Sequence, residues 1–193
     1  MTSRMLKVVG LSLAWAAIAG AQQAPAAAPA APPPGPAVGD SWIDFTAPGA
    51  TKEGTLAKPI HLADYKGKVV VLAFFPKART GGCTQQMTSY RDQYSTLFNS
   101  GKDVVLLGIS SDADTTLAAW AKEQNFPFQF VSDDHQVIAK LYGTMPAQGT
   151  AQKRFLYVIG PDGKITYTAK QFQPFQPSAY TDLSDAIKKA VGK

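Results

Sequence analysis

Apolar and polar residues fall into blocks along the chain, and their spacing switches between the period of strands and that of helices. Residues 68–75 form a near-continuous apolar run rich in β-branched side chains, which is typical of a strand buried on both faces. From Met87 to Phe98 apolar side chains recur at helical spacing, and Gly101 is placed to end that helix. The pattern predicts a buried strand followed by a long amphipathic helix.

Strands and helices continue to alternate toward the C-terminus. Further strands are predicted at 103–110, 128–131, 154–159 and 164–168, and further helices at 115–124, 135–142 and 178–191. Gly160-Pro161-Asp162-Gly163 separates the last two strands and favours a hairpin turn. This order predicts one α/β domain over residues 39–193, with a central mixed β-sheet flanked by helices on both faces.

The first 21 residues have the three-part layout of a secretory signal peptide. A basic start (1–7) precedes an apolar stretch (8–20), and small residues at 19–21 provide a cleavage site after Ala21. An uncleaved anchor is the alternative, but the apolar run of about 13 residues is short of the ~20 that span a bilayer. We therefore expect export, to the periplasm or the extracellular side, without stable membrane anchoring. Residues 22–38, rich in Ala and Pro, are predicted to form an extended, semi-rigid linker.

The composition fits one globular domain and argues against a nucleic-acid-binding protein. Of the 193 residues, 45% are hydrophobic and 17% are charged, which is enough apolar material for a sizeable core. The formal net charge is +5, but the 19 basic residues are not gathered into a run. No nucleic-acid partner is expected.

Cysteine occurs once, as Cys83. A single cysteine excludes an intramolecular disulfide, a Cys-x-x-Cys dithiol and a multi-thiolate metal site. In an oxidising compartment, an unpaired cysteine indicates a reactive thiol or an intermolecular partner. The two histidines, His61 and His135, have no second ligand nearby in the sequence, so no metal site is expected.

Cys83 opens the helix that follows the buried strand, after a loop that carries Lys77, Arg79, Gly81 and Gly82. A helix N-terminus presents unpaired N–H groups and the positive end of the helix dipole, both of which stabilise an anion such as a thiolate. Nearby cations add to this effect, and glycines let the backbone approach a small bound molecule. A buried, inert cysteine is the alternative, and the loop favours a nucleophile.

The residues around Cys83 are similar to a family signature. Pro76, Thr80 and Cys83 match the Pro-x-x-x-Thr-x-x-Cys pattern of the peroxiredoxins (AhpC/TSA-like), and the chain most resembles their bacterioferritin comigratory protein, or peroxiredoxin Q, group. The likeness extends over nearly the whole domain, through 38–45, 62–67, 90–92 and 126–143 to Arg154 before the strand at 156–159. It implies a thioredoxin-like fold and no cofactor.

The resemblance also implies a role for each matching residue. Cys83 would be the peroxidatic nucleophile, and Thr80 would orient the thiolate and the peroxide. Arg154 would hold the thiolate ionised and stabilise the charge on the departing oxygen. Pro76 would shield the site from water. The backbone at Gly82 would donate to the peroxide, and Thr84 and Gln86 are expected to support the site.

Two positions depart from the group's pattern. Gly81 replaces the usual Pro, so the loop has more conformational freedom before substrate binds. Thr88 stands where many members carry a resolving cysteine, five residues after the nucleophile. We therefore expect one-Cys recycling by an external thiol or a thioredoxin-like reductant, and susceptibility to overoxidation.

These observations favour a thiol-dependent peroxidase that reduces hydrogen peroxide, organic hydroperoxides or both through a Cys83 sulfenic acid. The alternative from another class is a non-enzymatic redox sensor or docking module that forms mixed disulfides through Cys83. Thr80 and Arg154 favour turnover, since a docking thiol needs no transition-state stabiliser. Thiol–disulfide oxidoreductases and copper-delivery proteins of this fold need a second cysteine that the chain lacks. A monomer or weak dimer is expected.

Overall fold

The computed structural model describes residues 34–146 and 149–192. The predicted signal peptide and most of the predicted linker lie outside these residues. The helices are α1 (Gly81–Asp92), α2 (Tyr94–Leu97), α3 (Asp114–Gln124), α4 (Val137–Leu141) and α5 (Pro177–Val191), with 3-10 turns at Leu62–Tyr65 and Asn99–Gly101.

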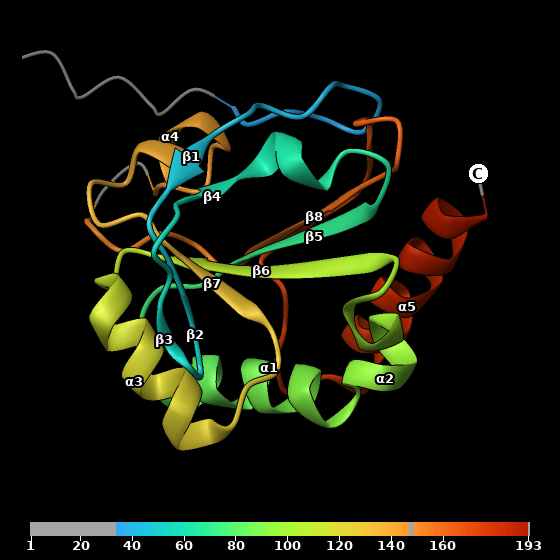
Figure 1. Cartoon of the computed structure of the whole chain (residues 1–193). Coiled ribbons are helices and arrows are strands. Elements are labelled where there is room, and N and C mark those ends of the chain that lie inside the picture. The colour runs from blue at the N-terminus through green and yellow to red at the C-terminus, as the bar shows by residue number, and fades with distance from the viewer. Residues whose placement is uncertain (1–33, 147–148, 193) are drawn as a thin grey trace, which may run out of the picture.

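Seven strands form one mixed sheet in the order β3-β2-β7-β6-β5-β8-β9, and β1 pairs with β4 in a separate two-stranded ribbon (Figure 1). The strands are β1 (Thr46–Ala47), β2 (Gly49–Thr51), β3 (Gly54–Thr55), β4 (Ile60–His61), β5 (Val69–Phe74), β6 (Val104–Ser110), β7 (Gln129–Ser132), β8 (Phe155–Ile159) and β9 (Ile165–Lys170). Strands β5, β6 and β7 are parallel, whereas β8 runs antiparallel to β5. The predicted mixed sheet is confirmed.

The central strand β5 divides the core into two layers. All six of its residues are buried, as the apolar run predicts. Val69, Val71 and Ala73 face one hydrophobic cluster, and the alternate residues from Val70 to Phe74 face the other. Because successive side chains of a strand point to opposite faces, one short segment contributes to both layers.

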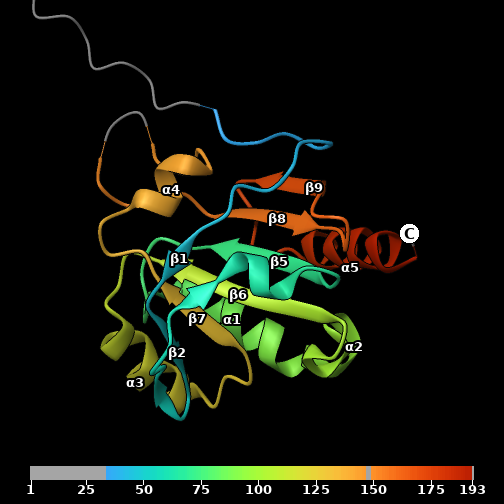
Figure 2. The same ribbon diagram turned by 45° about the horizontal axis from the view of Figure 1, so that its top comes forward.

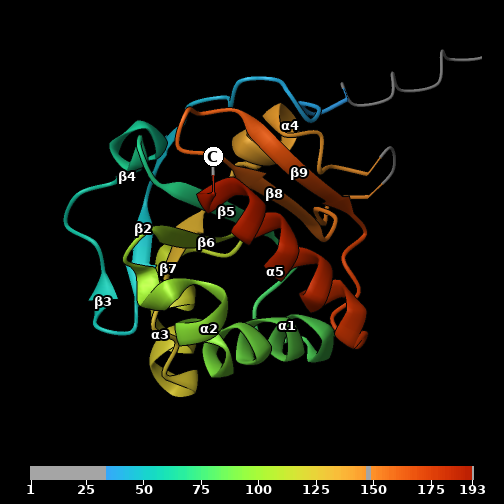
Figure 3. The same ribbon diagram turned by 90° about the vertical axis from the view of Figure 1, so that its right-hand side faces the viewer.

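Helices cover both faces of the sheet. Leu97, Trp120 and Leu183 bring α2, α3 and α5 into the cluster that also holds the buried side of α1. On the other face, Ile138 of α4 packs with Leu62 and with residues near β1 and β4. Figures 2 and 3 show α4 on the opposite side of the sheet from α1 and α5.

The prediction of one continuous helix through Met87 to Phe98, ending at Gly101, is wrong, because the structure has two helices there. Gln93 leaves helical geometry (φ −106°, ψ 16°) and separates α1 from α2. A 3-10 turn at Asn99–Gly101 follows α2 and ends this helical segment. In one continuous helix, Tyr90 and Phe98 would be about 12 Å apart along the axis. The break brings their rings to 5.4 Å between centroids, edge to face, within the core.

The other predicted elements agree with the structure to within about two residues, the usual uncertainty of element ends, whereas the short strands β1 to β4 were not predicted. In the turn between β8 and β9, Gly163 takes a positive φ of 78°, and its N–H donates to Gly160 O at 2.9 Å. In the described ranges, no helix has the length and apolar character needed to cross a membrane.

Candidate active site

The loop after β5 places Cys83 in the first turn of α1. The N-cap residue, Thr80, is extended (φ −83°, ψ 151°), and its carbonyl accepts a hydrogen bond from Thr84 N at 2.8 Å. Cys83 is the third residue of α1, among backbone N–H groups that have no acceptor within the helix. The sequence position therefore puts Cys83 at the helix end whose free N–H groups and dipole stabilise an anion.

Neighbouring elements anchor this loop. Asp112 Oδ2 accepts from Ala78 N at 2.7 Å. Arg79 donates to both carboxylate oxygens of Glu123 in α3, at 2.6 and 3.1 Å, and this hydrogen bonding lowers the pKa of Glu123. The guanidinium of Arg79 is thus engaged by α3, so the cation at the sulfur is not this loop arginine.

Gln152 ties together the strand ends beneath the loop. Its side chain is 1% exposed, and Nε2 donates to Phe75 O at 2.8 Å and to Ile109 O at 2.6 Å. These carbonyls lie just after β5 and within β6, so one amide fixes the spacing from which the loop departs. The sequence offers no periodic or motif signal for this residue.

Arg154 supplies the cation next to Cys83. Its Nη2 lies 3.2 Å from Cys83 Sγ, and Cys83 is fully buried. The two residues are 71 positions apart and meet because β8 runs antiparallel to β5, with Leu156 opposite Ala73. Arg154, the residue directly before β8, therefore lies beside the end of β5, where the Cys83 loop begins.

A buried hydrogen-bonded chain holds the guanidinium in place. Arg154 Nη1 donates to Gln86 Oε1 at 2.5 Å, and Gln86 Nε2 donates to Tyr90 OH at 3.0 Å. Gln86 and Tyr90 are both fully buried, and burial raises the pKa of Tyr90 above its ordinary value, so its hydroxyl stays neutral. These hydrogen bonds link the guanidinium of Arg154 to the aromatic core around α1.

The segment between β9 and α5 covers the same centre. A Cβ built on Gly82 would lie 3.2 Å from Arg154 Nη2 and 3.8 Å from both Pro174 and Phe175. Pro174 O accepts from Tyr180 OH at 2.9 Å, which fixes this segment against α5. A side chain at position 82 would therefore press on the guanidinium.

The structure brings four of the predicted site residues together: Cys83, Arg154, Gln86 and Gly82. The Thr80 hydroxyl donates to Lys77 O at 3.0 Å, within the loop. Pro76 is half-buried in this loop, and Thr84 is half-buried in α1.

Sequence reasoning missed the hydroxyl of Tyr90 as a partner of Gln86, although their i,i+4 spacing on one helix signals such a pair. It also missed the cover formed by Pro174 and Phe175, because nothing local to those residues refers to position 82. Across residues 34–146 and 149–192, no group of three or more His, Cys, Asp or Glu side chains is arranged to hold a metal.

Comparison with known proteins shows which family has a sequence like this one. Residues 38–168 match the AhpC/TSA family, which covers the loop, Cys83 and Arg154. The chain belongs to this family. The predicted peroxiredoxin membership is confirmed, and it indicates a thiol-dependent peroxidase, with the single cysteine consistent with a one-Cys type.

Curated relatives carry the name of the predicted group. The chain is 36% identical over 132 residues to chloroplastic peroxiredoxin Q of Sedum lineare, covering 67% of this chain and 69% of that protein. It is 36% identical over 135 residues to a putative peroxiredoxin bcp of Coxiella burnetii, covering 67% and 85%. Of the wheat (Triticum aestivum) peroxiredoxin Q the chain spans only 58%.

Solved peroxiredoxin structures share the fold. PrxQ of Xylella fastidiosa superimposes with a TM-score of 0.68 at 20% identity, covering 80% of this chain and 97% of that one. Peroxidoxin BcpB of Mycobacterium tuberculosis gives 0.67 at 24% identity, covering 79% and 96%. The predicted thioredoxin-like α/β fold is confirmed.

Proposed function

We propose that Cys83 reduces hydrogen peroxide, organic hydroperoxides or both, becomes a sulfenic acid, and is recycled by an external thiol. The observation that carries this proposal is the 3.2 Å contact between Cys83 Sγ and Arg154 Nη2 in the first turn of α1. A cation held at the sulfur stabilises negative charge there as the sulfur reacts, and the thiolate is the nucleophilic form of cysteine.

In the oxidative step, the Cys83 thiolate attacks one peroxide oxygen and the O–O bond breaks. The sulfur gains an S–OH group, and the other oxygen leaves as an alkoxide or hydroxide that takes up a proton. Arg154 stabilises the charge on the departing oxygen. The Thr80 hydroxyl donates to Lys77 O, so its lone pairs can accept from the peroxide.

Other predicted residues take supporting roles in this proposal. The backbone N–H groups of Gly82 and Cys83 donate to the peroxide, and half-buried Pro76 limits the access of water. Thr84 stabilises the start of α1 through its N–H bond to Thr80 O. Gln86 positions Arg154.

The reductive step needs a thiol from outside, since the chain has no second cysteine. A thiol RSH attacks the sulfenic sulfur, giving Cys83–S–S–R and water. A second thiol then releases Cys83 and leaves with R as a disulfide. A small thiol or a thioredoxin-like protein satisfies this chemistry.

The first test follows one equivalent of hydrogen peroxide by stopped-flow and intact-mass measurement on the reduced protein. We expect rapid peroxide loss and a mass gain of about 16 Da, one oxygen atom, which Cys83→Ser abolishes. A thiol no faster than free cysteine would refute the peroxidase. Rapid oxidation without recycling by any thiol would favour the sensor or docking module.

We also propose that the protein is exported after cleavage following Ala21 and works as a monomer or weak dimer, without stable membrane anchoring. The layout of residues 1–21 supports the first point. Expression in a bacterium with two membranes tests it. Mature protein beginning at Gln22 in the periplasmic fraction is expected, and full-length protein retained in the cytoplasm would refute export.

A further inference from the structure

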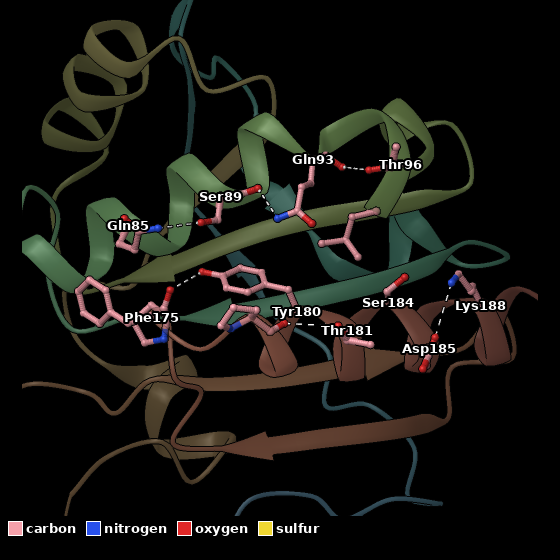
Figure 4. Close-up of a pocket in the computed structure, with 13 residues that line it drawn as sticks. Gln85, Ser89, Gln93, Thr96, Phe175, Tyr180, Thr181, Ser184, Asp185 and Lys188 are labelled. Carbon is pink, nitrogen blue, oxygen red and sulfur yellow. Dashed lines mark hydrogen bonds and ion pairs between the residues drawn. The ribbon is translucent and has the colours of Figure 1, made fainter.

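A groove of about 630 Å³ lies between α1–α2 and α5 (Figure 4). Its two walls carry mainly hydroxyl and amide side chains. Gln85, Ser89 and Thr96 come from α1 and α2, Gln93 from the break between them, and Thr181 and Ser184 from α5. A volume of this size falls in the range of small-molecule sites, roughly 300–1,000 Å³.

One end of the groove adjoins the Cys83 centre. Gln85 and Ser89 follow Gly82 at intervals of three and seven residues, so they lie on the same face of α1, and Gln93 follows directly after the helix. Phe175 lines this end of the groove and is also 3.8 Å from the Cβ position of Gly82. Arg154 Nη2, the group that contacts Cys83 Sγ, is 3.2 Å from that position. This end of the groove therefore lies beside Gly82, the residue next to the reactive pair.

The lining suits a peptide better than an alkyl chain. Gln85 Nε2 donates to Ser89 Oγ and Gln93 Nε2 to Ser89 O, both at 3.2 Å. Both amide side chains keep their carbonyl oxygens for a ligand's N–H groups, and the Ser184 hydroxyl can donate to a ligand's carbonyl. The Thr96 and Thr181 hydroxyls donate to Gln93 O at 3.1 Å and Pro177 O at 3.4 Å, so they offer a ligand their lone pairs. From Gln85 to the end of α1 at Asp92 the wall rises about 10 Å, which three residues of an extended peptide would match, and Gln93 and Thr96 continue it for a fourth.

We propose that this groove binds the reductant, a short peptide thiol in extended conformation with its cysteine at the Gly82 end. The proposal rests on the proposed function, because only a sulfenic acid at Cys83 needs such a thiol. The peptide thiol attacks the sulfenic sulfur, forming Cys83–S–S–peptide and one water, and a second thiol releases the peptide as a disulfide. The groove would thereby supply from outside what a resolving cysteine supplies within a chain.

The test compares capped tetrapeptides that carry cysteine at either end with N-acetylcysteinamide, which has the same thiol but no further peptide groups. The full chain is oxidised with one equivalent of hydrogen peroxide and then mixed with each thiol. We expect one tetrapeptide to react about tenfold faster than N-acetylcysteinamide, from the hydrogen bonds it gains in the groove. Thr181→Trp, which fills the groove, and Gln85→Ala, which removes an amide, should reduce that advantage. Equal rates for all thiols in the wild type would overturn the proposal.

The matched control is Thr115→Trp, the same substitution at an exposed position of α3 outside the groove lining. It should keep the tetrapeptide preference. Each variant should also keep the wild-type rate with hydrogen peroxide, which reports that the site is folded. If Thr181→Trp instead slows only oxidation by cumene hydroperoxide, the groove holds the organic part of a peroxide and the proposal is wrong.

A second measurement separates this inference from the peroxidase itself. Reduced Cys83 is mixed with the same thiols as their activated disulfides with thionitrobenzoate, so that Cys83–S–S–R forms and thionitrobenzoate leaves. No peroxide takes part. A tetrapeptide preference that Thr181→Trp removes would support the groove even if peroxide oxidation failed. Its absence would overturn the groove while leaving the peroxidase intact.

Discussion

At the scale of single residues, the reactivity of Cys83 depends on how one guanidinium is held. Arg154 divides its donors between the sulfur and Gln86, and Gln86 in turn is fixed by Tyr90. A long cationic side chain would otherwise lose much of its effect to rotamer freedom. The buried amide therefore converts a cation that is merely near the sulfur into one with a fixed direction.

Arg154→Lys should slow oxidation of Cys83 by hydrogen peroxide about a hundredfold, the usual effect of removing one preorganised donor from a transition state. Lysine keeps the charge, but it lacks the fork that contacts sulfur and Gln86 together. Stopped-flow fluorescence measures the rate constant.

The matched control is Arg91→Lys, since Arg91 is also half-buried on the same layer and donates to Gln124 O at 2.8 Å. It should change the melting temperature and leave the rate within about twofold. Equal slowing in both variants would contradict a specific role for Arg154.

Gln86→Leu should slow the same step about tenfold, because Arg154 keeps its charge but loses the acceptor that directs it. The variant also strands the buried hydroxyl of Tyr90, at a cost of about 1–3 kcal/mol in the free energy of unfolding. Rate and stability are measured on the same samples, by stopped-flow and urea denaturation.

Tyr90→Phe separates the two effects of that substitution. It removes the hydroxyl but leaves the contact between Gln86 and Arg154. We expect a stability loss near that of one hydrogen bond, about 1 kcal/mol, with little change in rate. A large rate loss in Tyr90→Phe and none in Gln86→Leu would refute the positioning role of Gln86.

At the scale of elements, long segments with a clear period could be predicted and short ones could not. The strand at 68–75 is long enough for its continuous apolar run to indicate burial on both faces. The helix at 178–191 is long enough for its helical period to indicate burial on one face. Strands β1 to β4 have two or three residues each, too few for any period, and they were missed. The break at Gln93 was missed because the apolar spacing continues through it while the tertiary contact between Tyr90 and Phe98 bends the chain.

The ribbon of β1 and β4 carries a pH-sensitive contact. His61 Nε2 lies 2.7 Å from Asp44 Oδ2, and Asp64 is 3.5 Å from Nδ1. Hydrogen bonding to Asp44 is the main cause that raises the pKa of His61 above 6.5. Because the pKa of His61 is raised in the folded state, the contact stabilises the folded protein fully at pH values below the pKa of the unfolded chain. This stabilisation is lost as the pH rises through the folded-state pKa of His61.

His61→Gln cannot take up the proton, so it isolates this contribution. We expect the melting temperature of the wild type to exceed that of His61→Gln most near pH 5 and least near pH 9. These two pH values lie roughly two units below and above the pKa of an ordinary histidine, so they bracket its titration. Differential scanning calorimetry across this range measures it. A difference that grows with pH would have the wrong sign.

At the scale of the whole molecule, the topology explains what the sequence could reveal about the site. Cys83, Thr80 and Pro76 lie within one loop, and a local signature sufficed to find them. Arg154 was found only through the resemblance, since its place beside Cys83 follows from the antiparallel pairing of β5 with β8. Gln152, Pro174 and Phe175 come from still other segments, and no local pattern indicates their contacts with this region.

Recycling is also a property of the whole molecule, because the chain has one cysteine and Thr88 occupies the usual position of a second. In α1 the Thr88 hydroxyl donates to Thr84 O at 2.8 Å. The Cα atoms of residues five apart on a helix are about 8.7 Å apart, beyond the roughly 4.4–6.8 Å that a disulfide spans. A cysteine at 88 could therefore reach Cys83 only if the start of α1 unwound.

Thr88→Cys tests whether the fold permits that unwinding. If it does, one equivalent of peroxide should give a product about 2 Da lighter than the reduced protein, with loss of helical circular dichroism. Excess peroxide without thiol should then add about 32 Da to the wild type, as a sulfinic acid, but not to the variant. Thr96→Cys, a thiol at an exposed position of α2, controls for cysteine number and should overoxidise at Cys83 as the wild type does. Overoxidation of Thr88→Cys to the same extent would show that α1 stays folded at the sulfenic stage, and that only a thiol from outside can reach the sulfur.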